Sequence, residues 1–468
     1  MECLYRNKTP IKGRIYYFDF TSHFPAEGAK HELPYGEPKY MPDAWRPMNT
    51  PSGTWDKATH SAFEKFFGFV EVEIRTLDEK RLPLHAVKSD KKLLFPVVKN
   101  WTRTYLFSEE MRKGLQQGQY EYNILKALSF KKGMLLKEAF EDAIARKAQA
   151  RLDNEPALAE TWKICANSLY GVFGQRTKDM QCVKVYDRGS PLALKHQEDL
   201  VNEAEQGNYH VCRVIDDIPI KDHNVGVAAA ITSYARIRLF ELMDGVRQVG
   251  GNVLYCDSDS MICDVDLLNT PHLQKDFMFD LKYNPDGTPD VATLGDALGS
   301  LKNECYDKMK KLVKKGKIPQ SVMDHHLREE NYSIYFDECI TYQAKFYGLR
   351  KTLVNGYKVE ICKCKGYKVD KEDASSKHGK VLTYDMLRNP PDKSRKNRNK
   401  LWESVLKNAQ FQFRCPKSCF VNEKNPWGVS YLTVKKEFRL TYTKGNVDKD
   451  GFITPFVILS EVRLEGES

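Results

Sequence analysis

Cysteine and long apolar runs are both scarce in this sequence. Twelve cysteines in 468 residues are too few for a disulfide-stabilised scaffold, and Cys165, Cys256 and Cys263 stand inside apolar stretches. We therefore expect a reducing, intracellular compartment. No stretch approaches the ~18 uninterrupted apolar residues that a membrane helix needs. Residues 1–12 have no apolar core, so we do not expect a secretory signal.

Internal repeats and long low-complexity tracts are also absent from the sequence. Hydrophobic residues make up 41% of the chain and charged residues 29%, a core-forming composition that excludes a disordered or fibrous protein. A chain of this length has room for roughly two to four compact domains.

Most of the chain has no excess of positive charge. The excess lies in the last quarter of the sequence. Residues 341–468 hold 26 Lys and Arg against 14 Asp and Glu, whereas the rest of the chain holds 47 against 49. A localised basic surface favours a polyanionic partner such as nucleic acid. A solvated lysine-rich face would have the same composition, so charge alone leaves both interpretations open.

Side-chain periodicity places the main secondary-structure elements. It predicts strands over Gly13–Phe20, Asn252–Cys256 and Ser260–Val265, and helices over Leu135–Leu152, Ala157–Gly174, Val227–Arg247 and Leu294–Lys314. The turn ending in Pro156 separates the first two helices, which therefore form a helical hairpin. The last two strands form a β-hairpin with an acidic tip.

Carboxylates gather at the ends of these predicted strands. Asp257 and Asp259 lie two residues apart at the hairpin tip and point to one side, and Asp19 ends the first strand. Such carboxylates repel each other unless a cation lies between them, and Mg²⁺ accepts one or two carboxylates together with water and phosphate oxygens. Three of them can build a two-metal site for phosphoryl transfer. For the acidic pair alone, an Asp-rich turn is the simpler interpretation.

One face of the predicted helix over 157–174 carries a second group of polar residues. Lys163, Asn167, Tyr170 and Gly171 are spaced i, i+4, i+7 and i+8. A lysine, an amide, an aromatic ring and a bare backbone suit a triphosphate with a stacked base. Arg151 on the partner helix is a candidate second phosphate ligand. Taken alone, the pattern favours a solvated lysine and a core tyrosine.

Together the three segments resemble motifs A, B and C of the family B DNA polymerases, in the family's order. Motif A, Asp-x-x-Ser-Leu-Tyr-Pro, is matched at Asp19, Ser22 and Pro25. Motif B, Lys-x-x-x-Asn-Ser-x-Tyr-Gly, is matched in full by residues 163–171. Motif C, Tyr-x-Asp-Thr-Asp-Ser, is matched by residues 255–260 with serine in place of threonine. The resemblance implies an α+β right-hand polymerase fold, with a palm on an antiparallel sheet, helical-hairpin fingers and a thumb.

Further segments resemble the protein-primed subgroup, which occurs in viruses, phages, linear plasmids and self-synthesising transposons. Residues 33–38 resemble its Pro-x-Gly-x-Pro element, and residues 294–299 with Lys302 and Glu304 resemble its stretch after motif C. The resemblance implies a division into palm (1–40), an insertion like the terminal-protein-contact region (41–125), fingers (126–175), a processivity-like insertion (176–224), palm (225–372) and thumb (373–468).

The resemblance also implies roles for the motif A and motif C residues. Asp19 and Asp259 would be the principal ligands of two Mg²⁺ ions, with Mn²⁺ as an alternative, and Asp257 would be an auxiliary catalytic carboxylate. Main-chain amides around Thr21–Phe24, including those of Ser22 and His23, would hold the β- and γ-phosphates. Phe24 stands where the family has the tyrosine that excludes a ribose 2′-hydroxyl. His23 replaces a leucine of the family.

The fingers residues would complete the nucleotide site. By the same resemblance, Lys163 and Arg151 would contact the triphosphate, Asn167 and Tyr170 would border the nascent base pair, and Gly171 would lie against DNA.

The primer would be held by a Lys-x-Tyr element, for which the sequence has two candidates. One is Lys345 with Tyr347, and the other is Lys351, which is followed by threonine and leucine. Lys365 resembles the Lys-Gly element near the thumb, and Lys444 resembles a late thumb segment, although glycine replaces the arginine that usually follows it. These are the expected DNA contacts.

The expected function is a DNA-directed DNA polymerase core that adds dNTPs to a primer 3′-hydroxyl, or to a terminal-protein hydroxyl, on primer-template DNA of a viral or mobile element. One alternative is a catalytically inactive DNA-binding or scaffold subunit derived from such a polymerase. Another is a reverse transcriptase or RNA polymerase, which would show adjacent aspartates at the hairpin tip. Motif A begins at residue 19, so we expect no exonuclease domain before it and consider a separate exonuclease chain as a partner.

Overall fold

A computed structural model describes residues 10–41, 63–89, 92–174, 181–187, 200–206, 209–215, 224–343, 345–364, 383–388, 410–416, 431–437 and 444–458. None of the helices in these ranges is long and apolar enough to span a bilayer. Six cysteines within them are free thiols.

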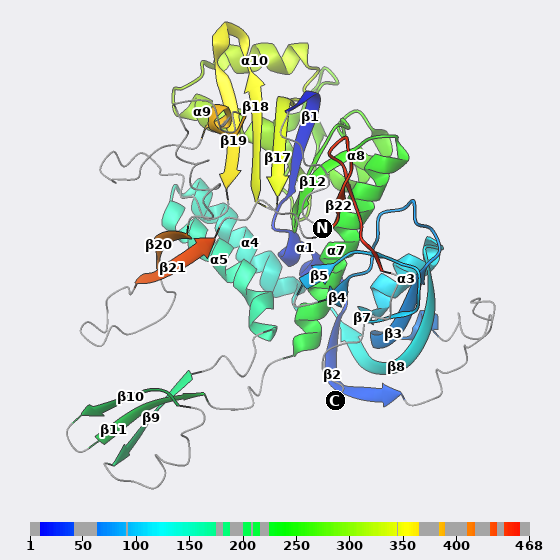
Figure 1. Cartoon of the computed structure of the whole chain (residues 1–468). Coiled ribbons are helices and arrows are strands. Elements are labelled where there is room, and N and C mark those ends of the chain that lie inside the picture. Colours follow the sequence, from blue (N-terminus) through cyan, green and yellow to red (C-terminus); the bar gives the residue numbers. More distant parts are fainter. Residues whose placement is uncertain are drawn as a thin grey trace, which may run out of the picture.

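A seven-stranded antiparallel sheet, which we call the central sheet, lies in the upper part of the view in Figure 1. The strand order is β12-β13-β1-β17-β18-β19, and β16 pairs with β1 beside this path. The strands are β1 (Ile11–Phe20), β12 (Val253–Asp257), β13 (Ser260–Cys263), β16 (Leu301–Asn303), β17 (Phe336–Gln343), β18 (Phe346–Thr352) and β19 (Lys358–Cys364). The N-terminal strand thus lies beside the acidic β-hairpin and between two parts of the chain that are far away in sequence.

The run of aromatic and β-branched residues in β1 explains its central place. Residues 15–18 and Phe20 are buried, whereas residues 12–14 remain exposed. Helix α7 (Val225–Gln248) packs on β12 and β13, and α9 (Glu304–Lys314) packs on β1 and β19. Strand and helix predictions for these segments, except the one over 294–314, agree with the structure to within about two residues.

Short helices and strands complete this region. They are α1 (His23–Lys30), α8 (Pro271–Phe277), β14 (Lys282–Tyr283), β15 (Pro289–Asp290), the 3₁₀ turns η3 (Val291–Thr293) and η4 (Val354–Gly356), α10 (Gln320–Glu329) and α11 (Tyr384–Arg388).

The prediction of one helix over residues 294–314 is wrong in its first half. Gly295 and Gly299 adopt left-handed backbone conformations, with φ of +77° and +79°, which a helix cannot contain. The helix α9 begins only after Asn303, whose side chain accepts hydrogen bonds from the amides of Cys305 and Tyr306. The two glycines and the Asn303 cap place the start of the helix at Glu304, ten residues later than predicted.

A second sheet, with strand order β2-β8-β3-β7, forms a unit beside α7 that we call the flanking unit (residues 33–133). Its elements are β2 (Leu33–Met41), β3 (Gly68–Thr76), β4 (Val87–Ser89), β5 (Lys92–Leu94), β6 (Val97–Val98), β7 (Thr102–Phe107), α3 (Ser108–Gln116) and β8 (Tyr120–Gly133). The unit is wider than the insertion expected over 41–125, because β2 and all of β8 belong to its sheet.

Two antiparallel helices form the predicted helical hairpin: α4 (Lys137–Leu152) and α5 (Pro156–Phe173). Pro156 is the first helical residue, where its missing N–H costs no hydrogen bond. Helix α4 packs on α1, with Gly28 against Phe140: a methyl group at residue 28 would come within 2.4 Å of the phenyl ring. The hairpin therefore contacts the turn that follows β1 (Figure 1).

The remaining strands fall in the expected second insertion and thumb. β9 (Gln181–Asp187), β10 (Leu200–Gln206) and β11 (Tyr209–Ile215) form one sheet, and β20 (Gln410–Pro416) pairs with β21 (Tyr431–Glu437). β22 (Asn446–Val447) pairs with β23 (Ile453–Thr454), and β24 (Val457–Ile458) pairs in parallel with β6 of the flanking unit.

Candidate active site

The central sheet brings the three predicted catalytic aspartates together. Ser260 on β13 lies opposite Asp19 on β1 on one side and opposite Asp257 on β12 on the other. Asp259 lies in the hairpin turn, and its carbonyl accepts a 2.7 Å hydrogen bond from the amide of Phe20. Residues separated by more than 230 positions thus share one end of the sheet.

Partial burial gives these carboxylates unusual protonation behaviour. The side chain of Asp19 is 21% exposed; burial is the main cause that raises its pKa to about 6, with Lys302 opposing the shift and Asp259 adding to it. Burial and the neighbouring Asp257 likewise raise the pKa of Asp259. Burial therefore makes the ionised forms costly, and each cation beside them reduces that cost.

The oxygen donors at this end of the sheet fit Mg²⁺ or Mn²⁺, with Asp19 and Asp259 as the residues that would hold the ion. Within the described ranges, no three carboxylate, imidazole or thiolate side chains form a ready-made cage. An ion at this place would therefore complete its shell with water or substrate oxygens, as Mg²⁺ does in phosphoryl-transfer sites.

Two lysines neutralise the outer aspartates. Lys302 Nζ lies 2.7 Å from Asp19 Oδ2 and 2.8 Å from Glu304 Oε1. Lys345 Nζ lies 2.6 Å from Asp257 Oδ2, and its main-chain N–H donates to the Tyr255 hydroxyl at 3.0 Å. The predicted site residue Lys345 thus forms an ion pair with Asp257, a second predicted site residue.

The two primer-grip candidates differ in their surroundings. Tyr347 is buried beneath the acidic hairpin, with its hydroxyl 2.9 Å from that of Tyr17 and its ring 4.6 Å from Tyr255. It supports the hairpin from below, and a direct contact with DNA stays a prediction.

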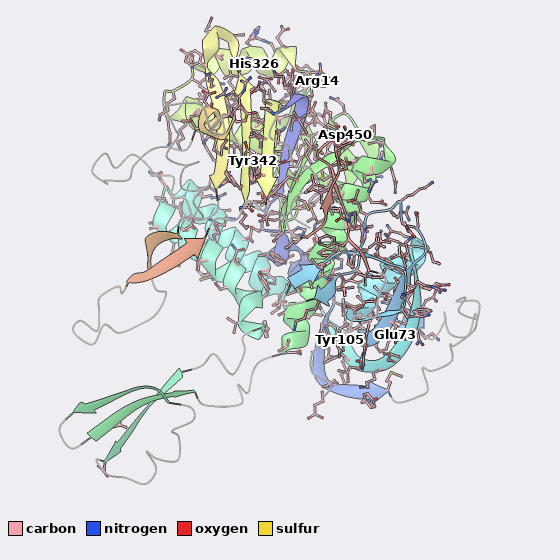
Figure 2. All side chains as sticks on the ribbon, viewed as in Figure 1. Arg14, Glu73, Tyr105, His326, Tyr342 and Asp450 are labelled. Carbon is pink, nitrogen blue, oxygen red and sulfur yellow. The ribbon has the colours of Figure 1, made fainter. Side chains whose placement is uncertain are left out.

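The structure contradicts the expected DNA contact of Lys351. Its side chain is only 1% exposed, and Nζ lies 2.5 Å from Glu330 Oε1. Glu330 also contacts His326 Nδ1 at 2.9 Å, at the end of the sheet remote from the helical hairpin (Figure 2). A lysine engaged in this buried ion pair cannot reach a nucleic-acid backbone, which leaves Lys345 as the candidate.

The turn from β1 into α1 presents main-chain amides. Ser22 has a left-handed conformation, with φ of +50°, and its carbonyl accepts the first helical hydrogen bond from Ala26. The amides of residues 22–24 therefore have no partner within the helix. Thr21, by contrast, donates its amide to Ser300 at 2.9 Å and is not available for a phosphate.

The His23 side chain does not face a nucleotide, which corrects the prediction as far as this side chain is concerned. It is 2% exposed, stacks on Phe20 at 4.4 Å and contacts the carbonyl of Ala235 through Nε2 at 3.0 Å. Burial lowers the pKa of the imidazole, so it is neutral and Nε2 is the donor. The histidine that replaces leucine thus fixes the turn to α7, and only its main chain can meet a substrate.

An aromatic pair joins this turn to the helical hairpin. The rings of Phe24 and Tyr170 stack with centroids 4.9 Å apart. Burial and, next, the charge of Asp259 raise the pKa of Tyr170. Lys163, Asn167 and Gly171 are exposed on the same helix, and Lys163 Nζ lies 3.0 Å from Glu160.

Lys147 on α4 is a candidate site residue that the sequence analysis missed. It is 8% exposed, and Nζ donates to Ser22 Oγ at 3.4 Å. Burial lowers its pKa, and Arg151, Lys163 and Lys302 add to the shift. Lys147 therefore contacts the turn after β1, and the charges of Arg151, Lys163 and Lys302 act on it.

A sequence signal for Lys147 existed. It occupies the apolar row Phe140, Ala143, Lys147 and Ala150, which is the buried face of α4. A lysine in such a row is unusual, because a buried ammonium needs an anionic partner.

Two further predicted DNA contacts are Lys365 and Lys444. Lys365 lies outside the described residues. Lys444 begins the segment 444–458, which is anchored by buried Ile453 and by the pairing of β24 with β6. Its contact with DNA stays a prediction.

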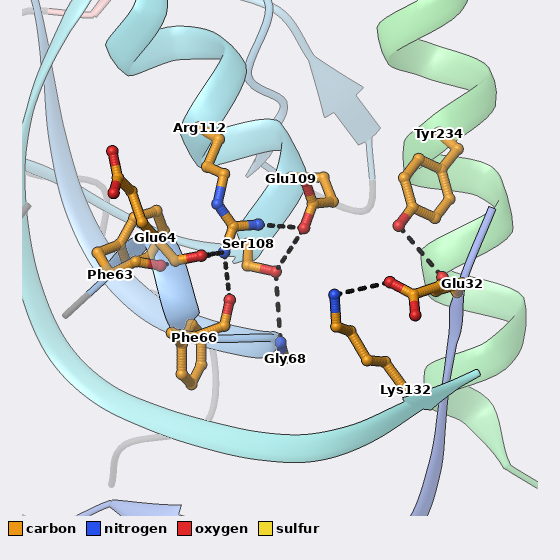
Figure 3. A network of polar contacts seen from close by, with 10 residues as sticks. All are labelled: Glu32, Phe63, Glu64, Phe66, Gly68, Ser108, Glu109, Arg112, Lys132 and Tyr234. Atoms are coloured by element: carbon orange, nitrogen blue, oxygen red, sulfur yellow. Dashed lines mark hydrogen bonds and ion pairs between the residues drawn. The ribbon is translucent and has the colours of Figure 1, made fainter. Parts of the chain in front are cut away.

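A large cleft of about 1060 Å³ lies elsewhere, between α1, α3 and α7, and none of the three aspartates lines it. Figure 3 shows its polar wall: Arg112 contacts Glu109 and the carbonyls of residues 63, 64 and 66, and Lys132 pairs with Glu32 at 2.7 Å. The positive and negative side chains of this wall pair with one another, which distinguishes the cleft from the carboxylate site. The cleft lies where the flanking unit meets α1 and α7.

The sequence matches a known protein family and is similar to that of a curated protein. Residues 2–245 match the family described as DNA polymerase type B, organellar and viral. A probable DNA polymerase of Podospora anserina is 23% identical over 288 residues, which are 55% of this chain and 22% of that protein.

Among solved structures, phi29 DNA polymerase with primer-template DNA and incoming nucleotides is 16% identical with a TM-score of 0.47, over 93% of this chain and 61% of that one. Its orthorhombic crystal form is 16% identical with a TM-score of 0.46, over 79% and 53%. The family B polymerase of Pyrobaculum calidifontis is 11% identical with a TM-score of 0.29, over 77% and 28%. The chain spans about a fifth of the Podospora protein and between half and two thirds of the phi29 chains.

Proposed function

Because this chain belongs to the organellar and viral type B DNA polymerases, we propose that it is a DNA-directed DNA polymerase core that adds dNTPs to the 3′-hydroxyl of a primer. The observation that carries the proposal is the meeting of Asp19, Asp257 and Asp259 at one end of the central sheet. In this proposal the central sheet is the palm, the helical hairpin is the fingers and the basic last quarter contains the thumb.

The residues around the carboxylates have complementary roles. Asp19 and Asp259 would hold the divalent ions, which supply charge stabilisation for in-line transfer of the α-phosphate and departure of pyrophosphate. Lys147, Lys163 and Arg151 bind and orient the triphosphate, so that less charge remains uncompensated as the leaving group forms.

The Phe24–Tyr170 pair would contact the sugar and the base of the nucleotide. Phe24, in the first turn of α1, stacks on Tyr170, and its ring would stand beside the ribose of a bound nucleotide. We propose that this ring excludes a 2′-hydroxyl and that Asn167, Tyr170 and Gly171 border the new base pair and the DNA. Lys345, held on Asp257, is the proposed primer contact.

We extend the proposal to the biological setting, supported by the resemblance of residues 33–38 to protein-primed polymerases. The chain would replicate a viral or mobile element in a reducing compartment, with a terminal protein as an alternative source of the priming hydroxyl. A separate exonuclease chain is the proposed source of proofreading.

Primer extension tests this function directly. The purified chain is mixed with a primer-template duplex, Mg²⁺ and four dNTPs, and the products are resolved by length. Extension supports the proposal. The scaffold alternative, which the intact carboxylate set does not favour, predicts tight DNA binding with no extension in either Mg²⁺ or Mn²⁺.

A further inference from the structure

A lysine outside the three sequence motifs lies in the middle of the carboxylate site. Lys302 on β16 stands directly opposite Asp19 in the pairing of β16 with β1. Its ammonium bridges two acids, at 2.7 Å from Asp19 Oδ2 and 2.8 Å from Glu304 Oε1. The Lys302 ammonium thus contacts an oxygen of Asp19, which is proposed as a principal metal ligand.

The backbone that carries this lysine is held in place. A methyl group on Gly295 would come within 2.4 Å of Lys302 Cβ, so the two residues are in close contact. Thr21, two residues after Asp19, donates its hydroxyl to the Gly295 carbonyl at 2.6 Å and accepts a hydrogen bond from the Gly299 amide at 2.9 Å. The opposition of Lys302 and Asp19 is therefore built into the fold.

The side chain itself has freedom that its backbone lacks. Lys302 is 27% exposed and ends in a flexible four-carbon stem, so its ammonium can move while the strand stays fixed. Although burial opposes it, the attraction of Asp19 and then Glu304 raises the pKa of Lys302 above its usual range, and the lysine stays charged.

We propose that Lys302 is the resident counter-cation of this site: its ammonium holds Asp19 and Glu304 when no divalent ion is bound and leaves Asp19 when an ion binds. This inference rests on the proposed metal-dependent function. An ammonium and a divalent ion on one carboxylate oxygen repel each other, so the lysine lowers the affinity of the free protein for the ion.

The proposed triphosphate site lies close to Lys302. Lys147 contacts Ser22 there, and the positive charge of Lys302 acts on Lys147. An incoming triphosphate supplies the negative charge that the lysine loses on leaving Asp19. Lys302 therefore makes ion binding and nucleotide binding cooperative, and it acts as a positioning residue and not by touching the reacting atoms.

Ion affinity of the full chain, without DNA or nucleotide, tests this role. Mn²⁺ binding is measured by electron paramagnetic resonance on wild type, Lys302→Met and Lys302→Arg, with Lys132→Met as the control lysine, because Lys132 forms an equally short ion pair in the flanking unit. We expect Lys302→Met to bind Mn²⁺ at least about fivefold more tightly, because one positive charge is removed. Lys302→Arg and Lys132→Met should resemble wild type.

Thermal unfolding gives a second readout. In EDTA, Lys302→Met should melt below wild type, because Asp19 and Glu304 then repel each other, and Mn²⁺ should raise its midpoint more than that of wild type. If Lys302→Met proves unfolded, Lys302→Gln takes its place. Unchanged or weaker Mn²⁺ affinity in a folded variant overturns the inference.

Failure of the inference and failure of the proposed function are distinguishable. Binding of Mn²⁺ that Asp19→Asn abolishes, with equal affinity in Lys302→Met, removes the counter-cation role and leaves the polymerase proposal intact. Tighter binding by Lys302→Met in a chain that never extends a primer supports the counter-cation role and removes the polymerase proposal.

Discussion

The rings of Phe24 and Tyr170 stack with their centroids 4.9 Å apart, so that α1 and α5 share one wall of the proposed nucleotide site. This contact joins residues that are 146 positions apart in the sequence. Under the proposed function, ribose selection depends on this contact, and the first prediction follows from it.

Phe24→Ala should admit ribonucleotides. Loss of the ring opens space where a 2′-hydroxyl would lie, and we expect the preference for dNTP over rNTP to fall by about tenfold or more. The measurement is single-nucleotide incorporation at several concentrations of each substrate. Phe24→Tyr keeps the ring and should keep the preference; equal discrimination by the alanine variant would place the wall elsewhere.

Lys147→Met should weaken nucleotide binding. The variant keeps the length of the side chain and removes a charge that lies among Arg151, Lys163 and Lys302, so we expect KM for dNTP to rise about tenfold. DNA affinity, measured by fluorescence anisotropy, should change little. Lys137→Met, at the exposed start of the same helix, is the control, and a similar KM in both variants would argue against a phosphate contact.

Gly28→Ala should destabilise the packing of α1 against α4. The added methyl group would stand 2.4 Å from the buried Phe140 ring, so overpacking should cost ~1–3 kcal/mol and lower the thermal midpoint. Adding Phe140→Leu should recover part of the loss. Gly171→Ala is the matched control, because a methyl group there meets nothing within 4 Å. A wild-type midpoint for Gly28→Ala would show that the helices are not in close contact.

Acid should destabilise the flanking unit through His85. Its imidazole is 1% exposed, and burial, with a smaller effect of Arg236, lowers its pKa to about 3. The unfolded chain binds a proton near pH 6.5 and the folded chain does not, so stability is present above pH 6.5 and falls as pH drops toward 3, by at most ~1.4 kcal/mol per pH unit.

The test compares thermal midpoints at pH 7.5 and pH 5. Wild type should lose more stability over this interval than His85→Gln, whose amide can still pair with the Tyr122 hydroxyl that His85 contacts at 2.6 Å. Equal losses in the two proteins would assign the acid sensitivity to other groups.

Much of the central sheet and of the helical hairpin could be predicted because their signals are local. The aromatic run of β1, the acidic β-hairpin and the helix pair around Pro156 lie almost where periodicity places them. The resemblance also implied that Asp19 and the hairpin aspartates share a site, and the pairing of β1 with β13 sets Asp19 opposite Ser260.

The parts that could not be predicted depend on contacts between distant segments. Lys302 reaches Asp19 only because β16 pairs with β1, and Lys351 is unavailable only because it packs on Glu330. His23 is a core residue because its imidazole forms a hydrogen bond with a main-chain carbonyl of α7. Neither periodicity nor motif spacing shows which distant segments pair. The type of a side chain therefore predicted its chemistry, but not the residue that it contacts.

The most direct test of the central claim is single-nucleotide extension measured together with DNA affinity, on wild type, Asp19→Asn and Asp259→Asn. With Mg²⁺, the account predicts that wild type adds one matched dNTP and that each variant is slower by at least about 100-fold. All three proteins should bind the primer-template with similar affinity, because the substitutions remove charge from the carboxylate site and not from the basic surfaces. Extension by Asp259→Asn at the wild-type rate, or a folded wild-type chain that binds DNA and never extends it, would contradict the account.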